Sequence, residues 1–258
     1  MPESIQPEES DEDFAARAEA LRASIQNHPG RIAHNRWDSV RLVHAALKWN
    51  EHFLLRHIDF TGPEGEARAF SYMGMEREQR EAMQTFWMFL FLFLANYTAM
   101  NTTLVDNVRG LMANYRSTPF AQEEEKRRQS LGYAPVTQFL KDLRNYITHV
   151  TTPPLSFEMS FQNNETKFVA KVKSEPLLAS GRFTATAKQY IGDQQDIVIA
   201  DAVTEYAELR EAYYTWMFEQ FDALHGDDIR AHDELVNQQN AMYGLPAQSP
   251  APDDSSPV

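Results

Sequence analysis

The sequence feature that most restricts the fold is an unbroken run of ten apolar residues at positions 86–95, inside a segment that is helical in character from about Met75. A bilayer-spanning helix needs about 20 apolar residues, so this run is too short to cross a membrane and indicates a helix buried on nearly all sides. Its all-round apolarity also suits a helix between its own bundle and a second subunit, because one bundle face would leave aromatic side chains exposed.

Apolar residues recur at helical spacing in several other segments. This spacing predicts helices at about residues 11–26, 35–59, 135–150 and 194–224, and a short helix at 228–242. Four sets of breakers separate them, at His28-Pro29-Gly30, residues 61–65, Thr151-Thr152-Pro153-Pro154 and His225-Gly226. The stretch 61–65, rich in glycine and proline, is expected to be a loop. Most of the chain is therefore expected to be helical.

Residues 155–174 follow a different period. Leu155, Phe157, Met159 and Phe161 alternate with polar residues, and a second alternating series contains Phe168, Ala170 and Val172. Asn163-Asn164-Glu165 separates the two series, as in a β-hairpin with one apolar and one polar face. The predicted fold class is mainly α, a helical bundle with an inserted β-hairpin around residues 155–174.

The net charge of −13 comes mostly from the ends of the chain, because residues 1–13 and 245–258 together carry eight acids and no base. We expect disordered tails at 1–10 and 245–258 and a single helical domain at 11–244. The remaining charge is too negative for a long basic stripe, which argues against broad nonspecific binding to nucleic acid. The absence of cysteine and of signal-peptide features predicts a cytoplasmic protein without thiolate metal sites.

Arg144, Asn145 and His149 are the side chains with the clearest chemical meaning, and they lie near the end of the predicted helix 135–150. At about 100° per residue, Arg144 and His149 point about 140° apart, so one isolated helix does not aim both at one point. Asn145 and His149 are four residues apart and share a face, so the asparagine can orient the imidazole or contact the same ligand.

These three residue types suit metal-free phosphodiester cleavage. An imidazole can move a proton from a ribose 2′-hydroxyl or to a leaving oxygen, and a guanidinium can hold the scissile phosphate. One copy supplies one such histidine. Acid and base roles on opposite sides of one phosphate therefore predict a homodimer that apposes two such helices.

The stretch Arg-Asn-Tyr-Ile-Thr-His at residues 144–149 resembles the Arg-x4-6-His signature of the HEPN superfamily, in which a polar residue such as Asn145 follows the arginine. The resemblance covers residues 35–225 at the level of helix order, with the hairpin as an insertion. It implies a HEPN-like helical bundle, often a homodimer, and a metal-independent endoribonuclease of toxin-antitoxin or phage-defence systems. It also implies Arg144 and His149 as catalytic, Asn145 as assisting, RNA as substrate, an antitoxin or other partner protein, and no cofactor.

A second function stays open, a noncatalytic helical HEPN-like module whose apolar surfaces bind a partner protein. A ribonuclease needs Arg144 and His149 exposed in one cleft, whereas a binding module tolerates their burial or their pairing with Asp142. The mixed-sign run 123–128 is read as a solvated face or as a basic contact for a phosphate chain. Two weaker alternatives are metal sites: Glu51, His52, His57 and Asp59 in one, and His225, Asp227, Asp228 and His232 in the other.

Overall fold

The computed structural model describes residues 10–247 except 75, 163–164 and 193. Nearly all of both predicted tails, at 1–9 and 248–258, therefore lies outside the described residues. The chain divides into two compact units. The small unit comprises the residues up to Asp38 and from Phe218 onward, and the large unit comprises Ser39–Met217. Compactness does not establish how many parts fold independently, so the single domain expected at 11–244 stays a prediction.

The small unit is built from α1 (Asp11–Asn27), the first residues of α2 (Pro29–Ile58) and the end of α9 (Ile199–Met242). Trp37 stacks on Phe221, with ring centroids 4.4 Å apart, and meets the edge of Phe218. A Cβ atom on Gly30 would lie 2.0 Å from the carbonyl oxygen of Asp228. A side chain at Gly30 would therefore push the backbones of α2 and α9 apart.

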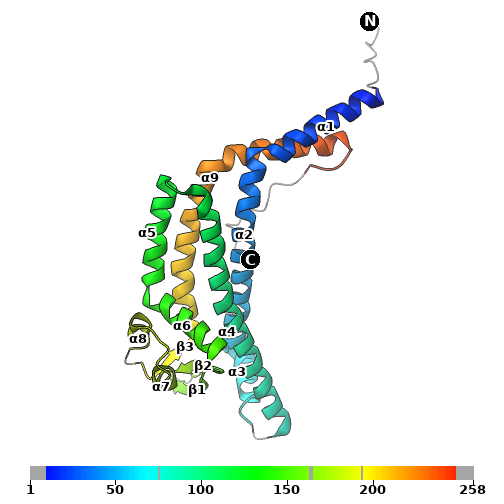
Figure 1. Cartoon of the computed structure of the whole chain (residues 1–258). Helices are drawn as coiled ribbons and strands as arrows, with labels where there is room; N and C mark the ends of the chain where they lie inside the picture. Colours follow the sequence, from blue (N-terminus) through cyan, green and yellow to red (C-terminus); the bar gives the residue numbers. More distant parts are fainter. Residues whose placement is uncertain (1–9, 75, 163–164, 193, 248–258) are drawn as a thin grey trace. The chain divides into compact units, whose positions relative to one another are not determined.

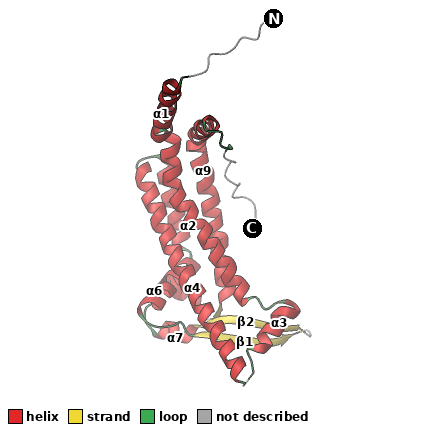
Figure 2. Cartoon of the chain, turned by 90° about the vertical axis from the view of Figure 1, so that its right-hand side faces the viewer, coloured by secondary structure: helices red, strands yellow, loops and turns green. Residues whose placement is uncertain are grey.

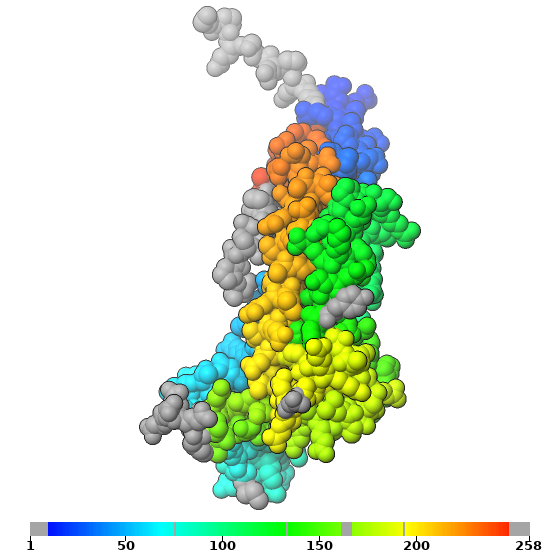
Figure 3. Space-filling view, turned by 90° about the vertical axis from the view of Figure 1, so that its left-hand side faces the viewer, coloured from blue at the N-terminus to red at the C-terminus, as the bar shows by residue number. Residues whose placement is uncertain are grey.

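The large unit holds a helical bundle with a small sheet at one end (Figures 1 and 2). Its further helices are α3 (Gly62–Ser71), α4 (Arg77–Met112), the 3-10 turn η1 (Ala113–Tyr115), α5 (Pro119–Tyr133), α6 (Pro135–His149), α7 (Ser174–Ala179) and α8 (Ala185–Ile191). In Figure 3, α5 lies beside the first half of α9, and the Tyr213 hydroxyl donates a 2.7 Å hydrogen bond to Glu124 between these helices. The mainly-α fold with an inserted hairpin is confirmed.

Helix α4 buries one stripe of its apolar run. Phe86 and Leu90 are almost fully buried, as is Leu94 one turn further on, whereas Met88 and Leu92 are exposed. The expectation of a helix buried on nearly all sides is therefore wrong for a single copy of the chain. One copy of the bundle covers a single stripe of this helix and leaves other apolar side chains in contact with solvent.

By length and composition, the helical stretch Arg77–Tyr115 is also long and apolar enough to cross a membrane, and it alone meets this test in the part of the chain that is described. The core helices of soluble proteins meet the same test. The Phe86 carbonyl accepts a 3.0 Å hydrogen bond from His57 on α2, and Tyr97 approaches the Val203 carbonyl of α9 at 3.5 Å. These contacts are consistent with a bundle helix in a soluble protein.

The sheet contains the predicted hairpin and one further strand. Strands β1 (Leu155–Gln162) and β2 (Glu165–Lys173) are antiparallel, and β3 (Asp196–Val198) pairs with β2. Figure 2 shows β1 and β2 side by side, with α3 next to them. The register places Phe157 opposite Ala170, so the two predicted apolar series share one face. Phe168 packs on this face against Phe60, which joins the hairpin to the end of α2.

Several predicted boundaries are wrong. Helix α2 begins at Pro29, six residues before the predicted start, because proline is well suited to the first helical turn. The expected loop at 61–65 contains the start of α3, whose first turn uses Pro63 in the same way. Helix α9 continues through Gly226 to Met242 as one helix, since a glycine costs a helix only about 1 kcal/mol. Met75, the predicted start of α4, lies outside the described residues.

A buried charged cluster lies in the core of the large unit. Arg210 on α9 is fully buried, and its guanidinium donates a 2.7 Å hydrogen bond to Glu51 on α2 and a 2.8 Å bond to Glu211. Burial alone would lower the pKa of Arg210, but Glu51 raises it above its ordinary value. Burial alone would raise the pKa of Glu211, but hydrogen bonds from His44 and Arg210 lower it to about 2. This cluster ties α2 to α9.

Candidate functional site

Helix α6 carries the predicted site residues. Pro135 occupies its first turn, and the helix ends at His149, where the Val150 amide caps the Tyr146 carbonyl. Its buried face consists of Val136, Phe139, Leu140, Leu143 and Tyr146. Asp142 is buried with them, whereas Arg144 and Asn145 lie half-buried beside this face and His149 is exposed. The predicted helix boundaries of 135–150 agree with the structure to within one residue.

The structure brings Arg144 and Asn145 together. The Arg144 guanidinium donates a 3.3 Å hydrogen bond to the side-chain oxygen of Asn145, and both residues are half-buried. His149 is exposed on the last turn of the helix. Within the described part of the chain, no hydrogen bond joins His149 to Arg144 or to Asn145. One copy therefore presents an arginine–asparagine pair and a separate, solvent-accessible imidazole, as the five-residue spacing predicts.

Asp142 is the carboxylate nearest to this pair in the sequence, and it is engaged elsewhere. It is almost fully buried, and its Oδ2 accepts a 2.7 Å hydrogen bond from the Thr184 amide at the start of α8. No ion pair between Arg144 and a carboxylate occurs among the residues that the structure describes. The charge of Arg144 therefore remains available to an external anion.

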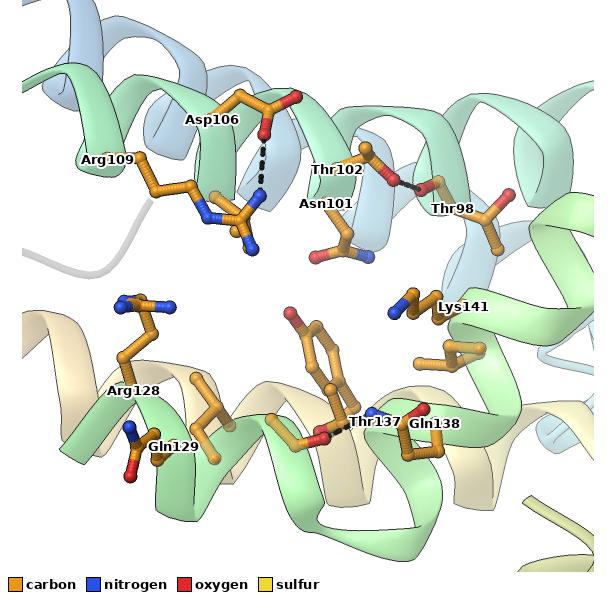
Figure 4. A pocket seen from close by; sticks show the side chains of 15 residues that line it. Thr98, Asn101, Thr102, Asp106, Arg109, Arg128, Gln129, Thr137, Gln138 and Lys141 are labelled. Carbon is orange, nitrogen blue, oxygen red and sulfur yellow. Dashed lines mark hydrogen bonds and ion pairs between the residues drawn. The ribbon is translucent and has the colours of Figure 1, made fainter. Parts of the chain in front are cut away.

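A pocket of about 410 Å³ lies beside this region and involves the same helix. Figure 4 shows that Arg109 of α4, Arg128 of α5 and Lys141 of α6 extend toward one hollow. We call this cavity the basic pocket. Neither Arg144 nor His149 lines it.

The basic pocket and the motif are connected along α6. Thr137, Lys141, Asn145 and His149 follow one another at four-residue intervals, which makes them neighbours along one ridge of the helix. Thr137 and Lys141 line the basic pocket, and Asn145 and His149 belong to the motif. The spacing in the sequence is the signal that could have found Lys141. The contribution of α4 and α5 could not be found this way, since those residues are distant in the chain.

The charge run 123–128 forms part of α5, and the reading as a purely solvated face is wrong. Glu124 is almost fully buried and accepts hydrogen bonds from Tyr213 and from Arg128. Arg128 in turn contributes to the basic pocket. On the exposed side of the helix, Lys126 and Arg127 pair with Glu123, and Glu125 pairs with Arg128.

Neither alternative metal site forms. In the first, Glu51 pairs with Arg210, and His57 donates to the Phe86 carbonyl. In the second, Asp227 pairs with Arg230, and His232 contacts Asp233. Across the described ranges, no three histidine, aspartate or glutamate side chains gather closely enough to hold a metal ion.

Comparison with known proteins leaves the family open: no family model, curated protein or solved structure matches the chain. The resemblance to the HEPN superfamily therefore rests on the motif at 144–149 and on helix order, and it stays a prediction.

Proposed function

We propose that the protein is a cytoplasmic, metal-independent endoribonuclease of HEPN type, in which Arg144, Asn145 and His149 of two subunits act on an RNA phosphodiester. The observation that carries the proposal is the availability of these side chains. Arg144 is bonded to a neutral amide rather than to a carboxylate, and His149 is exposed. A guanidinium in this state can bind a phosphate oxygen, and an exposed imidazole can exchange protons with substrate.

The proposed reaction is an internal transfer at phosphorus. The imidazole of one subunit accepts the proton of the ribose 2′-hydroxyl, and the 2′-oxygen forms a bond to phosphorus. The bond from phosphorus to the 5′-oxygen breaks, and the imidazole of the other subunit gives this oxygen a proton. Arg144 holds the nonbridging oxygens, whose negative charge grows during the reaction. Asn145 fixes the guanidinium through their hydrogen bond. The products are a 2′,3′-cyclic phosphate and a 5′-hydroxyl.

The exposed side of α4 supports the homodimer in this proposal. Met88, Phe89 and Leu92 are exposed, and Trp49 and Phe53 on α2 are about half exposed. The rings of Trp49 and Phe53 stack on each other, and that of Phe53 stacks on Phe93 of α4. A continuous surface of this kind is typical of protein–protein contacts. We infer that a second copy covers it.

The same surface favours a second candidate function, a noncatalytic module that binds a partner protein, such as an antitoxin. An RNA cleavage assay distinguishes the ribonuclease from the binding module. Purified protein, free of any partner, is incubated with a single-stranded RNA pool of random sequence in the presence of a chelator. The ribonuclease proposal predicts fragments that end in a 2′,3′-cyclic phosphate. RNA that stays intact at micromolar protein favours the binding module.

A further inference from the structure

The basic pocket is a second site that the proposed cleavage reaction does not use. It lies within the large unit, between α4, α5, α6 and α9, and its volume of about 410 Å³ falls in the range of cavities that hold small molecules. Three cations extend into it, and Asp106 is the one acid among the described residues that line it. The electrostatic character of its wall favours an anion.

Two of the three cations are free to move onto a ligand. Lys141 is exposed and makes no ion pair with any residue in the described part of the chain. Arg109 pairs with Asp106 at 3.1 Å on the surface, and exposed pairs of this kind contribute little to stability. Arg128 differs, because Glu124 and Glu125 both accept hydrogen bonds from it and fix its position. The pocket therefore combines one anchored guanidinium with two mobile cations.

Two residues of the wall each carry a buried polar atom that has no hydrogen-bond partner among the described residues. These atoms are Asn101 Oδ1 and Thr137 Oγ1. The amide nitrogen of Asn101 already donates a 2.9 Å bond to the Tyr97 carbonyl, so its unpaired oxygen can only accept. A buried polar group left without a partner destabilises the folded protein. A ligand hydroxyl group that reached either atom would give it a partner.

The aromatic content of the pocket wall indicates which class of ligand fits. Among the described residues, Tyr206 contributes the one aromatic ring to this pocket, so a planar base would find no pair of rings to stack between. Burial raises the pKa of Tyr206 to about 12, so its phenol stays neutral beside an anion. These features suit a compact, hydroxylated ligand better than a flat aromatic one.

We propose that the basic pocket binds a small phosphomonoester that carries hydroxyl groups, of the sugar phosphate class. Arg109 and Arg128 hold the phosphate at one end of the pocket, and Lys141 at the other end holds the hydroxyl groups together with Asn101 and Thr137. This site does not depend on the proposed ribonuclease activity, because none of its lining residues belongs to the motif.

Titration calorimetry on the full chain at low salt tests the proposal, with ribose 5-phosphate, ribose and inorganic phosphate as separate probes. We expect ribose 5-phosphate to bind at least about tenfold more tightly than inorganic phosphate, a difference of about 1.4 kcal/mol. Ribose alone should not bind. Equal affinity for ribose 5-phosphate and inorganic phosphate would overturn the role of Asn101 and Thr137, and absence of binding at millimolar ribose 5-phosphate would overturn the site.

Two lysine variants test whether ribose 5-phosphate binds in the basic pocket. Lys141→Met should weaken ribose 5-phosphate binding at least about tenfold, because it removes the unpaired cation of the wall. Lys126→Met is the control, since Lys126 lies on α5 near Arg128 and pairs with Glu123 without lining the pocket. Both lysines are exposed, so both variants should keep the wild-type circular dichroism spectrum. Equal affinities in the two variants would place the binding elsewhere and contradict the proposal.

Discussion

Two arginines of the large unit, Arg210 and Arg144, meet opposite surroundings. Arg210 is fully buried and holds carboxylates of Glu51 and Glu211. Arg144 is half-buried and holds only the amide oxygen of Asn145. Both arginines lie on helices of the same bundle, α9 and α6, so the secondary structure does not explain the difference.

This difference shows how burial and ion pairing distinguish an arginine that stabilises the fold from one that is available to bind a ligand. A buried arginine that loses its partners leaves uncompensated charge inside the protein, so its environment keeps it in place. An arginine with a neutral partner can exchange that partner for a phosphate at little cost. By this criterion Arg210 stabilises the bundle, and Arg144 is available for function.

The largest expected effect comes from Arg210→Met. This substitution keeps a long apolar side chain but leaves the Glu51 carboxylate without its ion-pair partner, which should lower the free energy of unfolding by about 3–5 kcal/mol. Urea unfolding followed by circular dichroism measures the change. The matched control is Arg144→Met, which should change stability by no more than about 0.5 kcal/mol. Similar losses in the two variants would remove the contrast between the two arginines.

A smaller effect is expected for Tyr213→Phe. The Tyr213 hydroxyl donates a 2.7 Å hydrogen bond to the buried Glu124, and burial together with this bond raises the pKa of Tyr213. Loss of one hydrogen-bond donor to the buried carboxylate should lower the free energy of unfolding by about 1–3 kcal/mol. This loss is smaller than that expected for Arg210→Met, because Arg128 still contacts Glu124. Thermal and urea unfolding measure it. A loss as large as that of Arg210→Met would show that the α5–α9 contact depends more on this bond than on apolar packing.

The smallest effect concerns the pH dependence of stability and depends on the half-buried His57. Burial lowers the pKa of His57 below 6.5, even though its imidazole donates a hydrogen bond to the Phe86 carbonyl. The folded state then binds fewer protons than the unfolded state between the two pKa values. Stability is therefore complete above about pH 6.5 and falls as the pH drops below it, with a slope of at most about 1.4 kcal/mol per pH unit.

Replacement of this imidazole tests the pH dependence. His57→Gln should reduce the slope of stability against pH between pH 7.5 and 5.5, because glutamine does not titrate. His225 in the small unit, whose pKa burial also lowers, keeps its own contribution to the slope. Urea unfolding at several pH values measures the slope. The same slope in wild type and His57→Gln would show that His57 gains its charge as easily in the folded protein as in the unfolded one.

Local patterns predict the elements that depend on neighbouring residues. The apolar spacing and the flanking prolines locate α6, and the alternation in 155–174 predicts the hairpin and its apolar face. Breakers are less informative, because a glycine or proline can start or interrupt a helix at small cost when packing favours it. For this reason α3 begins in an expected loop and α9 continues through Gly226.

The parts that the sequence does not predict depend on residues far apart in the chain. Arg210 stands beside Glu211 as in an ordinary solvated helix, and only its contact with Glu51, 159 positions away, reveals a core residue. The basic pocket likewise needs side chains from α4, α5 and α6. The motif at 144–149 is a local signal, because its three residues lie within two turns of one helix, and its role in catalysis stays a prediction. The proposed second subunit cannot be located from such a local signal.

The most direct test of the account compares RNA cleavage by wild type and His149→Ala in a chelator, with helical content and oligomer mass measured in parallel. We predict that His149→Ala lowers the cleavage rate by about 10²- to 10⁴-fold, because it removes a proton transfer. Arg144→Ala should be comparably damaging, and Arg144→Lys should restore only part of the rate, since an ammonium cannot reproduce a planar bidentate contact. Cleavage by His149→Ala at the wild-type rate, or intact RNA with wild type, would contradict the account.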